Sequence, residues 1–140
     1  MNNVHLKFGR KILDFLETCG GPFSTGINEF TEYGVWYCLG SKQYVIDFNE
    51  DGSIKYFACF FKIDKNEISN IENRVRPEDL SHGNTMYVLA CACTDKKGLA
   101  EIRKRLRVLG QGLSGVLWHR PKKADRLLYF PHQKGAVYGF

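Results

Sequence analysis

The feature that most constrains the fold is a long apolar run that leads directly into an amphipathic helix. Residues 85–94 (TMYVLACACT) are almost all apolar or small, which is typical of a central strand covered on both faces. A helix is predicted from Asp95 to Gly110, because apolar residues recur every three or four positions at Leu99, Ile102, Leu106 and Leu109. A buried strand followed by such a helix requires a sheet with helices packed on it.

The rest of the chain supplies the other elements of an α+β fold. Further strands are predicted where β-branched and aromatic residues cluster between turn signals, and Asp51-Gly52 is a strong hairpin signal. The expected elements are, in order, a helix over 4–19, a loop over 20–31, three strands at 33–39, 44–49 and 54–63 that form an antiparallel meander, a short helix within 64–80, the strand and helix above, and strands at 115–120 and 126–130. The prediction is therefore one mostly antiparallel sheet with helices packed on it.

Length and composition favour one globular domain. The 140 residues are 44% hydrophobic and 25% charged, so a single domain over 1–140 is expected. No apolar run reaches the ~20 residues of a membrane helix, and no secretory signal is visible. These features, with an odd count of five cysteines, predict reduced thiols in a cytoplasm and no membrane association. No His stands at zinc-ligand spacing, so no metal is expected.

Charge is divided unevenly along the chain. Residues 1–95 hold 9 Lys and Arg against 13 Asp and Glu, whereas residues 96–140 hold 11 against 2. A basic third of a domain favours an anionic partner, such as nucleic acid, a nucleotide cofactor or an acidic protein. The alternative is a solvated surface that keeps the protein soluble.

The turn between the apolar strand and the next helix is the first candidate site. Helix N-termini bind phosphate, Lys96 and Lys97 add positive charge there, and Gly98 allows close approach of a ligand. The alternative is an ordinary strand–helix turn with lysines in solvent. Cys91 and Cys93 lie two residues apart and therefore share one face of the strand, where small buried apolar residues are the alternative to a functional role.

The second candidate site is the basic hairpin near the end of the chain. His119 is a candidate general base, because its ordinary pKa lies near neutrality, and Tyr129 is a candidate to return a proton. Arginines and lysines meet phosphates, and Trp118 can stack on a base, so the hairpin is also a candidate nucleic-acid surface. The alternatives are a partly buried structural histidine and a solvated turn.

The order of elements resembles the Gcn5-related N-acetyltransferase (GNAT) family, and especially its small, divergent members in phage and prophage genomes. In local pattern the resemblance rests on residues 86–106 (MYVLACACTDKKGLAEIRKRL) and 115–130 (GVLWHRPKKADRLLYF). Against the family's phosphate loop, [Q/R]-x-x-G-x-[G/A], Gly98 and Ala100 match the last glycine and the small residue, and Asp95 stands in place of Gln or Arg. A five-residue turn replaces the family's helix between the last two strands.

This resemblance implies an acyltransferase-like protein that moves an acyl group from acetyl-CoA or another acyl-CoA to an amine. The central strand around Leu89, Cys91 and Cys93 would orient the donor. Its phosphates would be held by Lys96, Lys97, Gly98 and Ala100. His119 or Tyr129 would handle protons.

The alternative is a non-catalytic binding module of phage type. Its basic C-terminal third would engage nucleic acid or an acidic host protein, in the host cytoplasm if the chain is phage-encoded. The residues assigned to that surface are Arg103, Arg107, Arg120, Lys122, Lys123 and Arg126. An assembly component with no ligand is a third reading, which no residue pattern favours.

Overall fold

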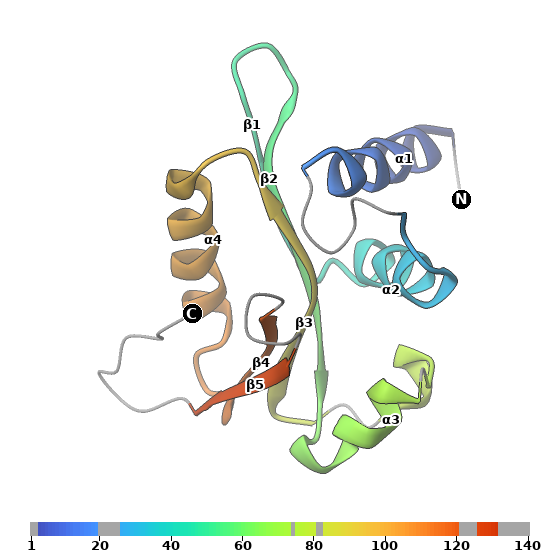
Figure 1. Cartoon of the computed structure of the whole chain (residues 1–140), viewed down its shortest axis with the longest axis vertical. Helices are drawn as coiled ribbons and strands as arrows, with labels where there is room; N and C mark the ends of the chain where they lie inside the picture. The colour runs from blue at the N-terminus through green and yellow to red at the C-terminus, as the bar shows by residue number, and fades with distance from the viewer. Residues whose placement is uncertain (1–2, 20–25, 74, 81–82, 121–125, 132–140) are drawn as a thin grey trace.

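A five-stranded mixed sheet organises the fold in a computed structural model that describes residues 3–19, 26–73, 75–80, 83–120 and 126–131 (Figure 1). The strands lie side by side in chain order: β1 (Tyr44–Phe48), β2 (Ile54–Ile63), β3 (Thr85–Cys93), β4 (Gly115–Arg120) and β5 (Arg126–Pro131). Only the β3–β4 pair is parallel, and the other three pairs are antiparallel. The predicted α+β class, with one mostly antiparallel sheet and helices packed on it, is confirmed. This layout is consistent with a GNAT-like fold without being specific to it.

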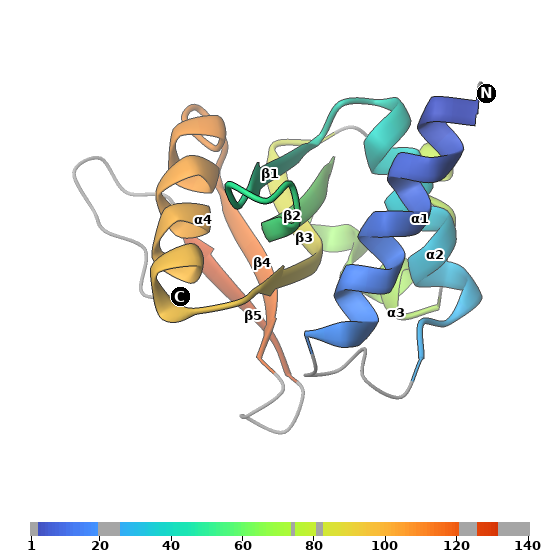
Figure 2. The same cartoon turned by 90° about the horizontal axis from the view of Figure 1, so that it is seen from above.

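Helices cover both faces of this sheet (Figures 1 and 2). On one face lie α1 (Asn3–Thr18), α2 (Glu29–Gly40) and α3 (Ile68–Glu72), with short 3-10 turns at Lys65–Glu67 and Pro77–Asp79. Of the helices that the structure describes, only α4 (Lys96–Leu109) lies on the other face. Among the described residues, no helix combines the length and apolar character needed to cross a membrane.

Each face of the sheet has its own hydrophobic core, and β3 contributes to both. Tyr87 packs into the core under α1 and α2, whereas Met86 and Val88 pack into the core under α4. All three side chains are buried, as expected for a strand at the centre of the sheet. The predicted central strand is therefore confirmed.

The predicted strand at 33–39 is wrong, because these residues lie within α2. The last residues of the predicted loop at 20–31 also belong to this helix. Its start is capped by Asn28, whose Oδ1 accepts a hydrogen bond of 2.8 Å from the amide of Thr31. The buried positions follow helical spacing at Thr31, Gly34, Val35 and Cys38. The three-stranded meander is thus reduced to a β1–β2 hairpin.

The other predicted elements are present at closely matching bounds. In the β1–β2 turn, the Gly52 amide donates to the Asn49 carbonyl, and Gly52 has a φ of +89°, which favours glycine. Asp95 caps the start of α4 and Gly110 caps its end. The short helix expected within 64–80 is α3.

Candidate functional site

Strands β3 and β4 pair over only four residues and then part. The parallel register joins residues 85–88 to residues 115–118, yet β3 continues to Cys93 and β4 continues to Arg120. At the paired end, the hydroxyls of Thr85 and Ser114 lie 2.9 Å apart and share a hydrogen bond. We call the open end the fork, formed by residues 89–93 of β3 and 119–120 of β4.

A β-bulge lies where the fork begins. On β2, Cys59 pairs with Ala90 and Phe60 pairs with Val88, so Leu89 has no partner across the ladder. As a result, Leu89 and Ala90 both pack into the core under α1 and α2. Bulges end regular pairing and redirect side chains, and they are frequent beside active sites.

The α2 helix packs closely on this bulge. A Cβ atom added at Gly34 would overlap the side chain of Leu89, so glycine is what permits the contact. The contact places α2 directly against the residue that the bulge leaves without a partner on β2.

The two cysteines of the fork are neutral, partly buried thiols at neutral pH. Cys91 and Cys93 both pack against the core under α4, which confirms that they share one face of the strand. Burial raises the pKa of the Cys91 thiol to about 12, and an adjacent Cys93 adds to the shift. Burial, followed by the charge of Asp95, also raises the pKa of Cys93. Since the thiolate is the reactive form, neither cysteine is set up as a nucleophile.

The start of α4 is a tightly packed capped turn. The Asp95 carboxylate accepts a hydrogen bond of 2.7 Å from the Gly98 amide. A Cβ atom at Gly98 would lie 3.1 Å from the Cβ of Cys93, so this glycine permits contact with the end of β3. Lys96, Lys97 and Ala100 are exposed. The turn thus holds its own carboxylate beside the amide that the sequence assigned to a phosphate.

The two flanks of α4 face different parts of the sheet. On one flank, the Arg105 guanidinium donates hydrogen bonds to the Ile46 carbonyl of β1 at 3.0 Å and to the Tyr56 hydroxyl at 2.9 Å. Helical periodicity places Arg103 and Arg107 on the opposite flank, toward β4. Arg103 is also close enough to Cys91 and Cys93 to oppose part of the rise that burial causes in their pKa. The sequence assigned both arginines to a surface for nucleic acid or an acidic protein, and in the structure both are only partly exposed.

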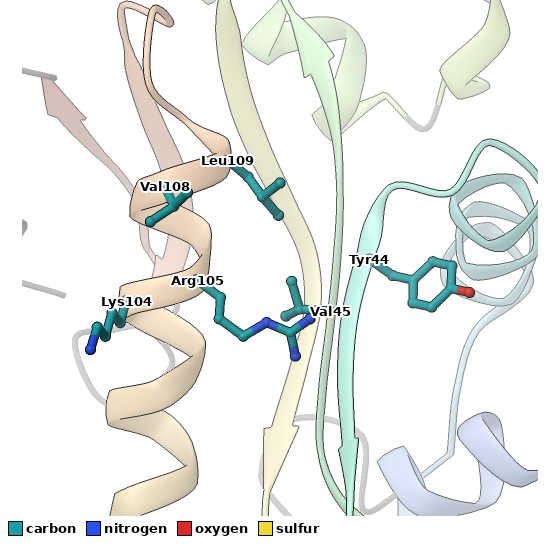
Figure 3. Close-up of a pocket in the computed structure, with 6 residues that line it drawn as sticks. All are labelled: Tyr44, Val45, Lys104, Arg105, Val108 and Leu109. Carbon is teal, nitrogen blue, oxygen red and sulfur yellow. The ribbon is translucent and has the colours of Figure 1, made fainter.

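A groove of about 350 Å³ lies on the β1 flank of α4, away from the fork (Figure 3). Arg105 extends from α4 toward Val45 of β1 in this groove, and Tyr44 points to the other side of the sheet. Val108 and Leu109 are 59% and 48% exposed. The candidate site is nevertheless placed at the fork, because interrupted strand pairing and a bulge coincide there.

The predicted proton-transfer residues lie on adjacent strands. His119 of β4 pairs with Leu127 of β5, and Leu117 pairs with Tyr129, so the two backbones lie one diagonal step apart. Arg120 and Arg126 are register partners at the end of the same hairpin. The side chains of these four site residues, and Lys122 and Lys123 entirely, lie outside the described residues.

The backbone bulge at Leu89 and the capping by Asp95 were not anticipated as parts of the site. The i, i+4, i+8 spacing of Leu99, Arg103 and Arg107 would have placed these arginines on one helix flank.

Within the described part of the chain, no group of three or more His, Cys, Asp or Glu side chains is arranged to hold a metal ion. No known protein family matches the sequence, and no curated protein is significantly similar to it.

Proposed function

We propose that this protein is acyltransferase-like and binds an acyl-CoA thioester in the fork, from which the acyl group passes to an amine. The observation that carries the proposal is the end of the β3–β4 ladder after Val88 and Trp118, directly beside the bulge at Leu89. The GNAT-like order of elements supports the same assignment.

The fork offers backbone groups to an extended ligand. Residues 90–93 of β3 pair with β2 on one side, and within the described structure no strand pairs with their other edge. An extended chain containing amides can hydrogen-bond to such an edge much as an added strand does. The pantetheine arm of CoA contains two amides and has this shape. The partly buried Cys91 and Trp118 provide apolar surface beside it.

Acyl transfer at this site would proceed by direct attack. The amine nitrogen forms a bond to the thioester carbonyl carbon, the carbon–sulfur bond breaks, and CoA leaves as a thiolate that takes up a proton. The amine loses its proton to a base, for which His119 is the candidate, and Tyr129 is the candidate donor to sulfur. Cys91 is a neutral thiol near pH 7, so a covalent acyl-cysteine step is not part of this mechanism. Holding donor and acceptor in line is the main contribution of such a site.

Isothermal titration with CoA and acetyl-CoA tests the binding step, and release of free CoA thiol with a panel of primary amines tests transfer. We expect saturable binding of one CoA per chain. His119→Gln and Tyr129→Phe should keep this binding and slow transfer by about 10²-fold or more, the usual contribution of general acid–base groups. Absence of binding by both CoA and acetyl-CoA would overturn the proposal.

A second candidate, an acidic protein partner, is favoured by the other flank of α4. Lys104 and Arg105 are exposed there beside the apolar side chains of Val108 and Leu109. A surface that combines positive charge with exposed apolar area suits an acidic, apolar protein segment better than a nucleic acid. Lys104→Glu with Val108→Asp should abolish binding of such a partner and leave CoA titrations unchanged. Salt-sensitive binding of a DNA duplex to the unaltered protein would assign the surface to nucleic acid instead.

A further inference from the structure

Strand β1 lies at one edge of the sheet, and within the described structure no strand pairs with its outer side. The Phe60 amide donates a hydrogen bond of 3.1 Å to the Gln43 carbonyl, so residues 43, 45 and 47 turn their backbone groups toward β2. The N–H and C=O groups of Tyr44, Ile46 and Phe48 therefore point away from the sheet. An edge of this kind is where an extended chain can add as a further strand.

The groove of about 350 Å³ between β1 and α4 follows this edge (Figure 3). Tyr44 lines the groove although its side chain points to the other side of the sheet, so it is the backbone of Tyr44 that faces the groove. Val108 and Leu109 are exposed on the α4 side. A strand added to β1 would thus lie beside α4 and cover apolar surface there.

Two side chains of the protein already occupy part of the edge. Arg105 donates a hydrogen bond of 3.0 Å to the Ile46 carbonyl, and the Asp47 carboxylate accepts one of 2.9 Å from the Phe48 amide. Both contacts are exposed to solvent, and neither covers the backbone groups of Tyr44. Side chains that cap an edge strand limit its pairing with other chains. The edge is therefore guarded at Ile46 and Phe48.

A carboxylate can displace the guard at Ile46. A hydrogen bond from a guanidinium group to a carboxylate is stronger than one to a neutral carbonyl. Lys104 is exposed beside Arg105, and among the described residues that line the groove none is acidic. An acidic segment in the groove would thus draw Arg105 away from Ile46, and the freed carbonyl could accept a hydrogen bond from the backbone of that segment.

We propose that an extended acidic segment of a partner protein adds to β1 as a sixth strand, and that Arg105 is the latch that opens the edge to it. This inference rests on the second candidate function, an acidic protein partner, and deepens it by naming how the partner binds. Alternate side chains of an added strand face opposite sides of the sheet. Its carboxylates would face Lys104 and Arg105, and its apolar side chains would face Tyr44 and Phe48, which is 46% exposed.

Isothermal titration with short peptides tests the added strand. The probe is a hexapeptide of alternating valine and glutamate, acetylated and amidated at its ends. Only alternate residues of an added strand turn their N–H groups toward the edge that they join. N-methylation of one set, either the valines or the glutamates, should therefore weaken binding about tenfold or more, and N-methylation of the other set by less than about twofold. The same hexapeptide with lysine in place of glutamate should not bind.

A substitution at Arg105 tests the latch. Arg105→Met keeps the apolar stem and removes the donors, so the valine–glutamate peptide should bind about tenfold more weakly. A valine–glutamine peptide should bind about twofold more tightly or better, because the Ile46 carbonyl is then open. Lys11→Gln, an exposed change in α1 on the other face, should alter each affinity by less than about twofold. Arg105 also donates to the Tyr56 hydroxyl. If its loss lowers the unfolding midpoint, Lys104→Gln replaces it and should weaken only the valine–glutamate peptide.

The outcomes separate strand addition from the acidic-partner function. If the valine–glutamate peptide binds and both methylated sets bind equally, strand addition is wrong and the acidic-partner function stands. If only the valine–glutamine peptide binds, with alternate sensitivity to methylation, strand addition stands and the acidic-partner function is wrong. Undiminished binding of the valine–glutamate peptide to Arg105→Met, or to Lys104→Gln in its place, would overturn the latch. Absence of binding by every peptide would overturn the whole inference, whatever the CoA titrations give.

Discussion

Gly9 allows α1 and α2 to pack in direct contact. A Cβ atom at this position would overlap several atoms of the Trp36 ring, which is rigid and held between the two helices. Gly9→Ala should therefore lower the free energy of unfolding by about 1–3 kcal/mol, the usual cost of overpacking. Urea denaturation measures this change.

Gly40→Ala is the matched control for Gly9→Ala. Gly40 also lies in a helix, at the end of α2, but nothing lies within 4 Å of its added Cβ atom. Alanine there should leave stability unchanged or raise it by up to ~1 kcal/mol, since alanine is the better helix former. Equal effects of the two substitutions on the free energy of unfolding would show that overlap with Trp36 is not the reason why residue 9 is glycine.

Cys91 gives the protein a predictable loss of stability at alkaline pH. Burial holds the pKa of its thiol at about 12, whereas a thiol in an unfolded chain ionises near ~8.5. Between these values the unfolded chain binds fewer protons than the native state, so the free energy of unfolding falls as pH rises, by up to about 1.4 kcal/mol per pH unit. Below that window the thiol is protonated in both states, and its contribution to stability is fully present. Cys91→Ala should flatten the pH dependence of urea denaturation between about pH 9 and about pH 11 without abolishing it, because burial also raises the pKa of Cys59. An unchanged slope would show that Cys91 titrates normally.

At the scale of the element, Asp95 affects the start of α4 in two ways, because it caps the helix and carries a negative charge. Asp95→Ala removes the acceptor for the Gly98 amide and should cost about 1 kcal/mol of stability. Asp95→Asn keeps a capping oxygen and should cost much less. Both changes remove a negative charge near the fork, so both should strengthen CoA binding by a few-fold if the diphosphate lies close by. Glu50→Gln, in the distant β1–β2 turn, controls for the change in net charge. Weaker CoA binding by Asp95→Asn would instead indicate that the carboxylate contacts the ligand.

Secondary structure was predicted correctly where a single hydrophobic periodicity dominated the sequence. It was predicted wrongly where two signals favoured different structures. The apolar stripe from Leu99 to Leu109 has no competing pattern, so α4 was predicted correctly. In α2, Tyr, Val and Trp side chains favour a strand, whereas the Asn28 cap and the spacing of buried residues favour a helix. Tertiary packing decided between them, because the helix lies on both α1 and the sheet and buries the small residue Gly34 against Leu89.

At the scale of the whole molecule, the sequence located the region of the candidate site but not its geometry. The spacing of Cys91 and Cys93 placed both on one face of the central strand, and this is confirmed. The bulge at Leu89 could not be predicted, because it depends on the register between β3 and a strand some 30 residues earlier in the chain. The fork could not be predicted either, because it depends on where the pairing between β3 and β4 ends.

The uneven charge of the chain provides the test that separates one bound cofactor from a bound polyanion. Residues 96–140 carry 11 Lys and Arg against 2 Asp and Glu, enough positive charge to engage many phosphates at once. A nucleic acid bound across this surface would release many counterions, and its affinity would fall about 10³-fold or more between 50 and 200 mM salt. A single bound CoA brings only a few phosphates to the protein, so its affinity should fall less than about tenfold over that range. Titration of CoA and of a short DNA duplex at both salt concentrations measures the two dependences. Steep salt dependence for DNA, together with competition between DNA and CoA, would show that the basic face and the fork are one polyanion site and would remove acyl transfer as the function of the fork.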